Sequence, residues 1–189
     1  MLNKINVLSI DTDYVRSPQA FNNLIKYFLK YVSDIQIKNF VFSQSHANIF
    51  YILEPLLKEK KLIDLVTIDE HHDISYFDNE ANESFCSSNW LGYYLKKQNF
   101  IDNIYWLTNH DSMKQKIHAD KLYVAYEFED IFFEKFDFIF VCNSPFYSNV
   151  ISELCFQTLI NIVTHNKKCQ KKDFFKPNLL NHNIKEIYA

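Results

Sequence analysis

The sequence is poor in glycine, with Gly92 as its single example among 189 residues. Phosphate-binding loops of the P-loop and Rossmann types need several positions without a Cβ, so both kinds of nucleotide site are excluded. The sequence also lacks the run of about 18 apolar residues that a membrane helix requires, and its first residues do not form a signal peptide. We therefore expect a cytoplasmic protein with no membrane partner.

Cysteine is sparse and neither sign of charge dominates. The four cysteines show no Cys-x-x-Cys spacing, so a reducing cytosol is the simplest interpretation. A formal net charge of −3 provides no general attraction to nucleic acid, and we expect no nucleic-acid partner. A composition of 48% hydrophobic and 23% charged residues is ordinary for a globular domain.

Short apolar runs alternate with amphipathic segments along most of the chain. This pattern predicts an α/β fold, a three-layer α/β/α sandwich with a mainly parallel sheet. The expected strands lie near 5–11, 38–43, 63–69, 102–107, 121–125 and 137–142, and the expected helices near 18–33, 47–60, 87–98 and 146–165. We predict a single domain over 1–165 and a solvated basic polar tail over 166–189. The segment 75–85 lacks periodicity and fits a surface excursion better than a substrate-gating loop.

The third expected strand ends in an Asp-x-His-x-Asp motif made by Asp69, His71 and Asp73. In extended backbone, alternate residues point to one face, so the three side chains can converge on one centre. Carboxylate oxygens with one imidazole suit a divalent ion such as Mn²⁺. The motif therefore predicts a metal site.

Two other strand ends carry further candidate ligands. The first expected strand ends at Asp11 and Asp13, and His46 follows the second. Alone, an Asp-x-Asp after a strand is more often a turn or a helix cap, and a lone histidine is more often structural. In a parallel sheet, however, ligands gather beyond the carboxyl ends of the strands, where all of these residues fall.

Together, four aspartates and two histidines in these contexts resemble the binuclear manganese site of the arginase and agmatinase (ureohydrolase) superfamily. The Asp-x-Asp motif opens this chain, an order similar to that of the short arginase-like proteins that include the peptide arginases. The resemblance covers about residues 5–150, with weaker echoes at 86–92 and 141–145. It implies one Mn²⁺ held by His46, Asp69, Asp73 and Asp11, and a second held by His71, Asp69, Asp11 and Asp13.

The resemblance also implies an activity. Two Mn²⁺ ions would activate water for attack on an arginine side chain within a (ribosomally made precursor) peptide, and the products would be ornithine and urea. Asp13 is expected to pass a proton to the leaving amine. Ordinary arginases have a proton-shuttle histidine and a guanidinium-binding glutamate that this chain lacks, so His72 is expected as a catalytic substitute. The expected substrate contacts are Glu70, Asn89 and His110.

Three other functions stay open from the sequence. A metal-dependent amidase or deacetylase of related fold would use similar ligands with zinc. A non-catalytic arginase-like domain that binds a peptide would account for the missing histidine and glutamate. A two-metal nuclease is disfavoured, because the sequence gives no sign of a basic groove. The oligomeric state is not predicted.

Overall fold

The computed structural model describes residues 4–32, 39–74, 85–97, 100–109 and 121–165. Its centre is one sheet in which every paired strand runs parallel, in the order β2-β6-β1-β3-β4-β5. The strands are β1 (Lys4–Asp11), β2 (Asn39–Ser43), β3 (Leu62–Ile68), β4 (Ile101–Leu107), β5 (Leu122–Ala125) and β6 (Phe138–Cys142). The predicted α/β fold is confirmed.

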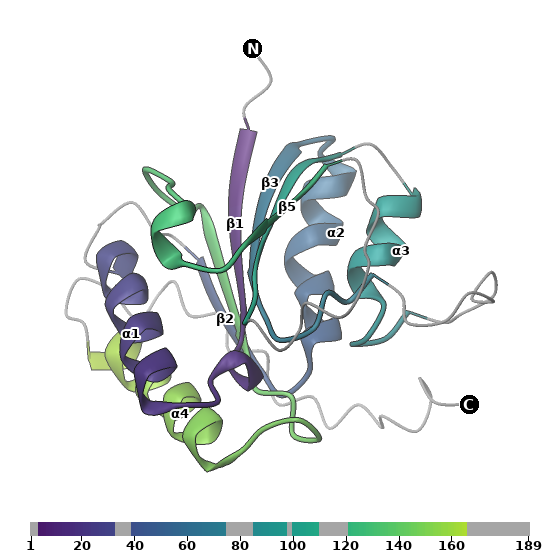
Figure 1. Cartoon of the computed structure of the whole chain (residues 1–189). Helices are drawn as coiled ribbons and strands as arrows, with labels where there is room; N and C mark the ends of the chain where they lie inside the picture. The colour runs from purple at the N-terminus through teal and green to yellow at the C-terminus, as the bar shows by residue number, and fades with distance from the viewer. Residues whose placement is uncertain (1–3, 33–38, 75–84, 98–99, 110–120, 166–189) are drawn as a thin grey trace.

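Helices cover both faces of the sheet, which makes three layers (Figure 1). On one face lie α1 (Pro18–Val32) and α4 (Val150–His165), packed on a core that includes Leu8 and Ile10 of β1. On the other lie α2 (Phe50–Lys58) and α3 (Trp90–Lys97), packed on a second core that includes Val7. The alternation along β1 follows the two-residue period of a strand.

The predicted elements are all found, with small differences at their ends. Helix α1 begins as expected, since Pro18 is its first residue and the Ser17 hydroxyl accepts a hydrogen bond from the Ala20 amide at 3.1 Å. The expected helix 146–165 starts later, at Val150, because the Asn149 side chain caps it by accepting from the amides of Ile151 and Ser152.

The expected helix 47–60 is preceded by the 3₁₀ turn η2 (His46–Ile49), and a second 3₁₀ turn, η1 (Thr12–Tyr14), follows β1. The predicted segment 75–85, apart from its last residue, and the predicted tail lie outside the described residues. Among the described residues, no helix combines the length and apolarity needed to cross a bilayer.

The carboxyl ends of four strands meet at one edge of the sheet. Asp11 at the end of β1 is the register partner of Cys142 at the end of β6, and Cys142 also pairs with Ser43 of β2. On the other side of β1, Ile10 pairs with Ile68, so the motif that follows β3 begins beside Asp11. The fold therefore brings the three acidic or histidine-bearing strand ends to one place.

Candidate metal centre

Metal-donor side chains gather at this edge in three overlapping groups, and the donor atoms within each group lie within 4.8 Å of one another. The groups are Asp11, His46 and Cys142; His46, Asp69 and Asp73; and Asp13, Asp69 and His71. All six ligands expected from the sequence are among them. Cys142 is an addition that the sequence analysis did not include.

His46 lies at the centre of the second group and is 1% exposed. Its Nδ1 is 2.9 Å from Asp73 Oδ2 and 3.0 Å from Asp69 Oδ2, yet neither contact has the direction of a hydrogen bond, and this nitrogen is left without a hydrogen-bond partner. A buried polar atom without a partner is costly. One nitrogen and two oxygens at such distances can instead share a cation placed between them.

The opposite nitrogen of the same ring is fixed by a serine. His46 Nε2 lies 2.7 Å from the buried Ser9 hydroxyl, and the ring stacks on Phe140 at 5.8 Å between centroids. Metal-binding histidines usually have their second nitrogen held by a hydrogen bond, which fixes the tautomer and the ring orientation. Ser9 therefore keeps Nδ1 directed at the aspartates.

Asp69 uses its two carboxylate oxygens in different directions. Oδ2 faces His46, while Oδ1 lies 3.7 Å from His71 Nδ1 and accepts the His71 amide at 2.8 Å. His71 Nδ1 in turn lies 3.0 Å from Asp13 Oδ2. A carboxylate with its two oxygens directed this way can bridge two cations, which in two-metal sites lie about 3.5–4 Å apart.

The motif reaches its last ligand by a turn, so the expectation of extended backbone through Asp73 is wrong. Strand β3 ends at Ile68, and Asp73 has a positive φ of 50°. The Asp73 carbonyl accepts the amides of Leu91 and Gly92, at the start of α3, and its Oδ2 accepts the Trp90 indole at 2.6 Å. Helix α3 thus holds Asp73 against His46.

Asp11 is held on the His46 side of the cluster. Its Oδ2 lies 3.6 Å from His46 Nδ1 and accepts the Ser144 hydroxyl, while its Oδ1 accepts the Asp13 amide at 3.1 Å. Among the donor groups of the described residues, Asp11 joins His46 and does not join His71. The structure therefore favours Asp69 over Asp11 as the shared carboxylate.

Several acidic and histidine side chains of the cluster have raised pKa values, so they hold their protons to higher pH than usual. Burial, with Asp13 nearby, raises the pKa of Asp11 to about 6, and burial together with Asp73 raises the pKa of Asp69 well above its usual range. Hydrogen bonds to Asp13 and Asp69 raise the pKa of His71 to about 11. Burial lowers the pKa of His46, but Asp69 and Asp73 more than offset it, so the net shift is upward.

These shifts and the donor chemistry fit a metal centre. Four buried carboxylates against two imidazoles leave excess negative charge in a low-dielectric setting, where unpaired charge is strongly unfavourable. Divalent cations would compensate the carboxylates and displace the extra protons, since metal ligands must be deprotonated. The oxygen and nitrogen donors are of the type that Mn²⁺ accepts.

Glu70, an expected substrate contact, already binds the guanidinium group of Arg16. Its carboxylate accepts the Nε and Nη2 groups of Arg16, and Arg16 Nη1 donates to the Tyr147 carbonyl at 2.9 Å. The Tyr147 ring lies 4.8 Å from the His71 ring. The Arg16 and Glu70 pair therefore stands beside the His71 side of the cluster.

His72 and Asn89, two more of the expected catalytic and substrate residues, accept hydrogen bonds from backbone amides. His72 is buried, its Nδ1 accepts the Ile74 amide at 3.0 Å, and burial lowers its pKa. Asn89 is buried, and its side-chain oxygen accepts the Cys86 amide at 2.9 Å. His110 lies outside the described residues. The roles assigned to all three from the sequence stay predictions.

Several residues that build the site were missed from the sequence. Both tryptophans of the chain support the Asp-x-His-x-Asp motif, since Trp90 binds the Asp73 side chain and Trp106 donates to the Asp69 carbonyl at 3.0 Å. Ser9 lies two residues before Asp11 and so on the same face of β1, a signal that strand periodicity could have supplied. Cys142 could be found only from the strand order.

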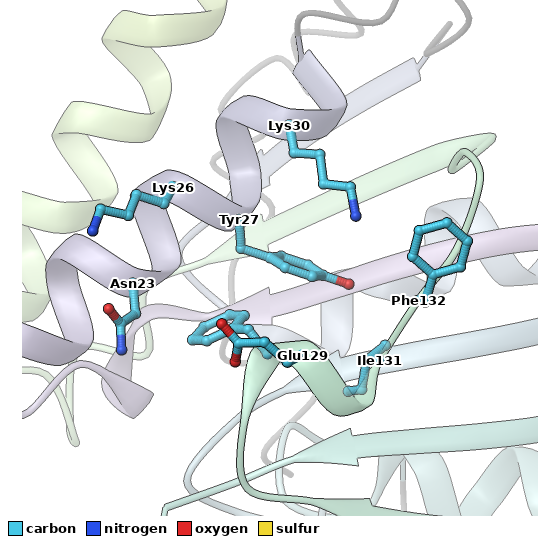
Figure 2. Close-up of a pocket in the computed structure, with 8 residues that line it drawn as sticks. Asn23, Lys26, Tyr27, Lys30, Glu129, Ile131 and Phe132 are labelled. Carbon is cyan, nitrogen blue, oxygen red and sulfur yellow. The ribbon is translucent and has the colours of Figure 1, made fainter.

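A surface pocket of about 460 Å³ lies elsewhere on the molecule, between α1 and the segment around η4 (Phe128–Asp130) (Figure 2). Its walls include Tyr27, Lys30 and Phe132, and none of its lining residues belongs to the three donor groups. The candidate site is therefore identified by its donor chemistry and not by this hollow.

No protein-family model, curated protein or solved structure matches this chain.

Proposed function

We propose that this protein is a two-metal hydrolase that cleaves a carbon–nitrogen bond, with an arginine side chain in a peptide as substrate and urea and ornithine as products. The buried cluster at the carboxyl edge of the sheet supports the metal part of the proposal. The resemblance to the peptide arginases supports the substrate. The same resemblance implies Mn²⁺ for both cations.

The observation that carries the proposal is the arrangement around Asp69. One of its oxygens faces the unpartnered Nδ1 of buried His46 and the other faces His71. The Nδ1 atom of His46 lies at 3.0 and 2.9 Å from the carboxylates of Asp69 and Asp73, whereas one ring nitrogen has a single hydrogen to donate. Two cation positions that share one carboxylate account for both contacts.

Each position has its own ligands in this proposal. His46, Asp73 and Asp11 hold the first cation, His71 and Asp13 hold the second, and Asp69 is shared. When bound, the cation pair would supply Lewis-acid polarisation and would lower the pKa of bound water to near neutrality. Ser9, Trp90 and Trp106 keep the ligands oriented through the hydrogen bonds described above.

The substrate reaches the site from the His71 side. His71 is 29% exposed at its side chain, whereas those of Asp13, Asp69 and His46 are exposed by 2% or less. Asp13 lies against the exposed imidazole and accepts the Glu70 amide, so its carboxylate is placed to hold or release a proton next to the entering group. The buried ligands exclude bulk water from the opposite side.

Arg16 already occupies the Glu70 carboxylate at the entrance, so a substrate arginine could bind Glu70 only by displacing Arg16. Arg16 binds the Glu70 carboxylate beside His71, and a substrate arginine would carry the same chemical group. Planar guanidinium and carboxylate groups recognise each other through paired hydrogen bonds. Phe146 and Tyr147, on the neighbouring loop, are 93% and 52% exposed and offer apolar contact to the flanking residues of a peptide.

The proposal is tested by measuring bound metal, and urea and ornithine release, from an arginine-containing peptide and from free arginine with Mn²⁺-loaded protein. Asp69→Asn should lose at least one cation and release no urea. Asp102→Asn removes an exposed carboxylate that binds Lys4 and should leave both readouts unchanged. Metal-loaded wild-type protein that releases no urea from any arginine peptide would refute the activity.

A non-catalytic peptide-binding domain is the second candidate. It is favoured by one observation, the occupation of Glu70 by Arg16, which leaves this carboxylate paired within the chain. Such a domain would bind metal and peptide without releasing urea. Isothermal titration with the same peptide, run beside the urea assay, separates the two functions.

A further inference from the structure

Cys142 ends strand β6, between the carboxyl ends of β2 and β1. It is fully buried, and its register partners on the two flanking strands are Asp11 and Ser43. Paired residues of a parallel sheet point to the same face, so the thiol and the Asp11 carboxylate lie on the side that α2 and α3 cover. His46 stacks on Phe140 of the same strand, two residues before Cys142.

The three donors lie close enough to be drawn together by one ion. The sulfur of Cys142, an Asp11 carboxylate oxygen and a His46 ring nitrogen lie within 4.8 Å of one another. In a tetrahedral zinc site, bonds of about 2.3 Å to sulfur and about 2.0 Å to oxygen place two donors about 3.5 Å apart. Binding would therefore draw the donors together by up to about 1 Å.

A second observation also points to a ligand at this place. The Nδ1 atom of His46 is buried, has no hydrogen-bond partner and lies 3.6 Å from the Asp11 carboxylate. The residue that carries this orphaned nitrogen belongs to the same donor group as the Asp11 carboxylate and the Cys142 thiol. A small core cysteine that only fills space would not account for the orphaned nitrogen.

We propose that Cys142 is a metal ligand, and that the cation position beside His46 therefore binds a borderline-soft ion such as Zn²⁺ or Co²⁺ in preference to Mn²⁺. The inference rests on the metal centre of the proposed function and not on its substrate. On binding, the S–H bond of Cys142 breaks, the proton passes to solvent and a metal–sulfur bond forms.

The two cation positions then differ in chemistry. Thiolate ligands select softer ions, whereas sites of carboxylate and imidazole alone accept Mn²⁺. Beside His71 the donors are Asp13 and Asp69, with no sulfur in that group. The protein would thus hold two different metals, or Zn²⁺ or Co²⁺ in both positions, and the expectation of two equivalent Mn²⁺ ions would not apply.

Cobalt spectroscopy tests the proposal directly. Full-length protein loaded with Co²⁺ should show a sulfur-to-cobalt charge-transfer band in the near ultraviolet, and Cys142→Ser should abolish it. The matched control is Cys155→Ser, which changes another buried thiol, in α4, on the opposite face of the sheet. Cys86, Cys155 and Cys169 stay in place in Cys142→Ser, so a band that persists there would come from another thiol and overturn the assignment.

Metal competition gives a second readout. The preference for Zn²⁺ over Mn²⁺ should fall by about tenfold or more in Cys142→Ser and in Cys142→Ala, because each removes the soft donor. Thermal unfolding checks that both variants fold. The proposal would be overturned if wild-type protein binds cobalt without the charge-transfer band. It would also be overturned if both variants keep the metal preference of the wild-type protein.

The two proposals fail in different ways. A charge-transfer band without urea release would retain the Cys142 ligand and refute the hydrolase. Urea release from a protein that binds cobalt without the band would retain the hydrolase and refute the Cys142 ligand. Protein that binds no cation in either assay would refute both.

Discussion

The Trp90 indole donates a 2.6 Å hydrogen bond to Oδ2 of Asp73, the same oxygen that lies 2.9 Å from His46 Nδ1. The indole ring also packs on the imidazole, with 4.8 Å between centroids. One side chain therefore fixes both the carboxylate and the imidazole of the donor group. An oriented carboxylate loses less entropy when it binds a cation, so Trp90 should contribute to metal affinity without being a ligand.

Replacing Trp90 by Phe should lower metal affinity by about 10 to 100-fold, the usual effect of losing a partner of a metal ligand. The phenyl ring keeps most of the packing, so the protein should stay folded. Isothermal titration with Mn²⁺ and with Zn²⁺ measures the change. Tyr94→Phe is the control, because Tyr94 is buried in the same helix and its hydroxyl binds Glu54. Equal affinities in the two variants would contradict this role.

Ser9→Ala should release the His46 ring and lower metal affinity by about tenfold or more. The Ser9 hydroxyl lies 2.7 Å from His46 Nε2, the ring nitrogen that faces away from the aspartates, and this hydrogen bond fixes the ring. Thr67→Val provides a matched control, since Thr67 is the register partner of Ser9 and its buried hydroxyl has no hydrogen-bond partner. Nuclear magnetic resonance of the His46 ring in the metal-free protein would show the altered tautomer independently of activity.

The stability of the metal-free protein should fall as pH rises. Asp11 and His71 have folded pKa values near 6 and 11, above their ordinary values of 3.8 and 6.5. A raised folded pKa stabilises the protein below the unfolded value, and this stabilisation is lost as pH rises through the folded value. The loss from Asp11 spans about pH 4 to 6, and that from His71 spans about pH 6.5 to 11.

Bound cations should reverse this trend, because they replace the protons that the cluster gives up. The difference in Tm between Mn²⁺-loaded and chelator-treated protein should therefore widen from pH 5 to pH 8. Asp11→Asn should flatten the metal-free Tm between pH 4 and 6 in particular. A Tm difference that is constant or narrows over this range would show that protons and cations do not compete for the cluster.

The chain's single glycine should tolerate no side chain. A Cβ on Gly92 would overlap the carbonyl group of Ile74, directly after Asp73, and the Gly92 amide donates to the Asp73 carbonyl at 3.1 Å. Gly92→Ala should therefore displace the Asp73 turn, lower metal affinity and reduce Tm, although alanine is favoured by about 1 kcal/mol in a helix interior. Calorimetry and metal titration measure both effects. Ser88→Ala, at an exposed position before the same helix, is the control.

Much of the fold could be predicted from local patterns. The apolar run before Asp11 indicated a buried strand, and the apolar spacing of about 3.6 residues after Pro18 indicated a helix. Both signals can be recognised from residue type and spacing alone. Helix α4 begins later than expected because the Asn149 side chain accepts the free amides of Ile151 and Ser152 and so caps the helix at this point.

The site was harder to predict, because its geometry depends on which strands are neighbours. The motif residues Asp69 and His71 could be recognised from residue type and spacing, but Asp73 reaches the cluster through a left-handed turn and not through extended backbone. Cys142 becomes the neighbour of Asp11 only because β6 inserts between β1 and β2. Such crossovers leave no periodic trace in one sequence.

That insertion has a consequence for how the protein acquires its ions. The Ser144 and Asp11 contact joins positions 133 residues apart, and the remaining donors come from strands between them in the chain. A nascent polypeptide that lacks β6 would already have the six aspartate and histidine donors, but neither Cys142 nor the strand that lies between β1 and β2, so the proposed centre would be complete only after synthesis has passed β6. Metal supply in the cell would then govern how quickly newly made chains mature, and starvation for the preferred ion would yield folded but vacant molecules.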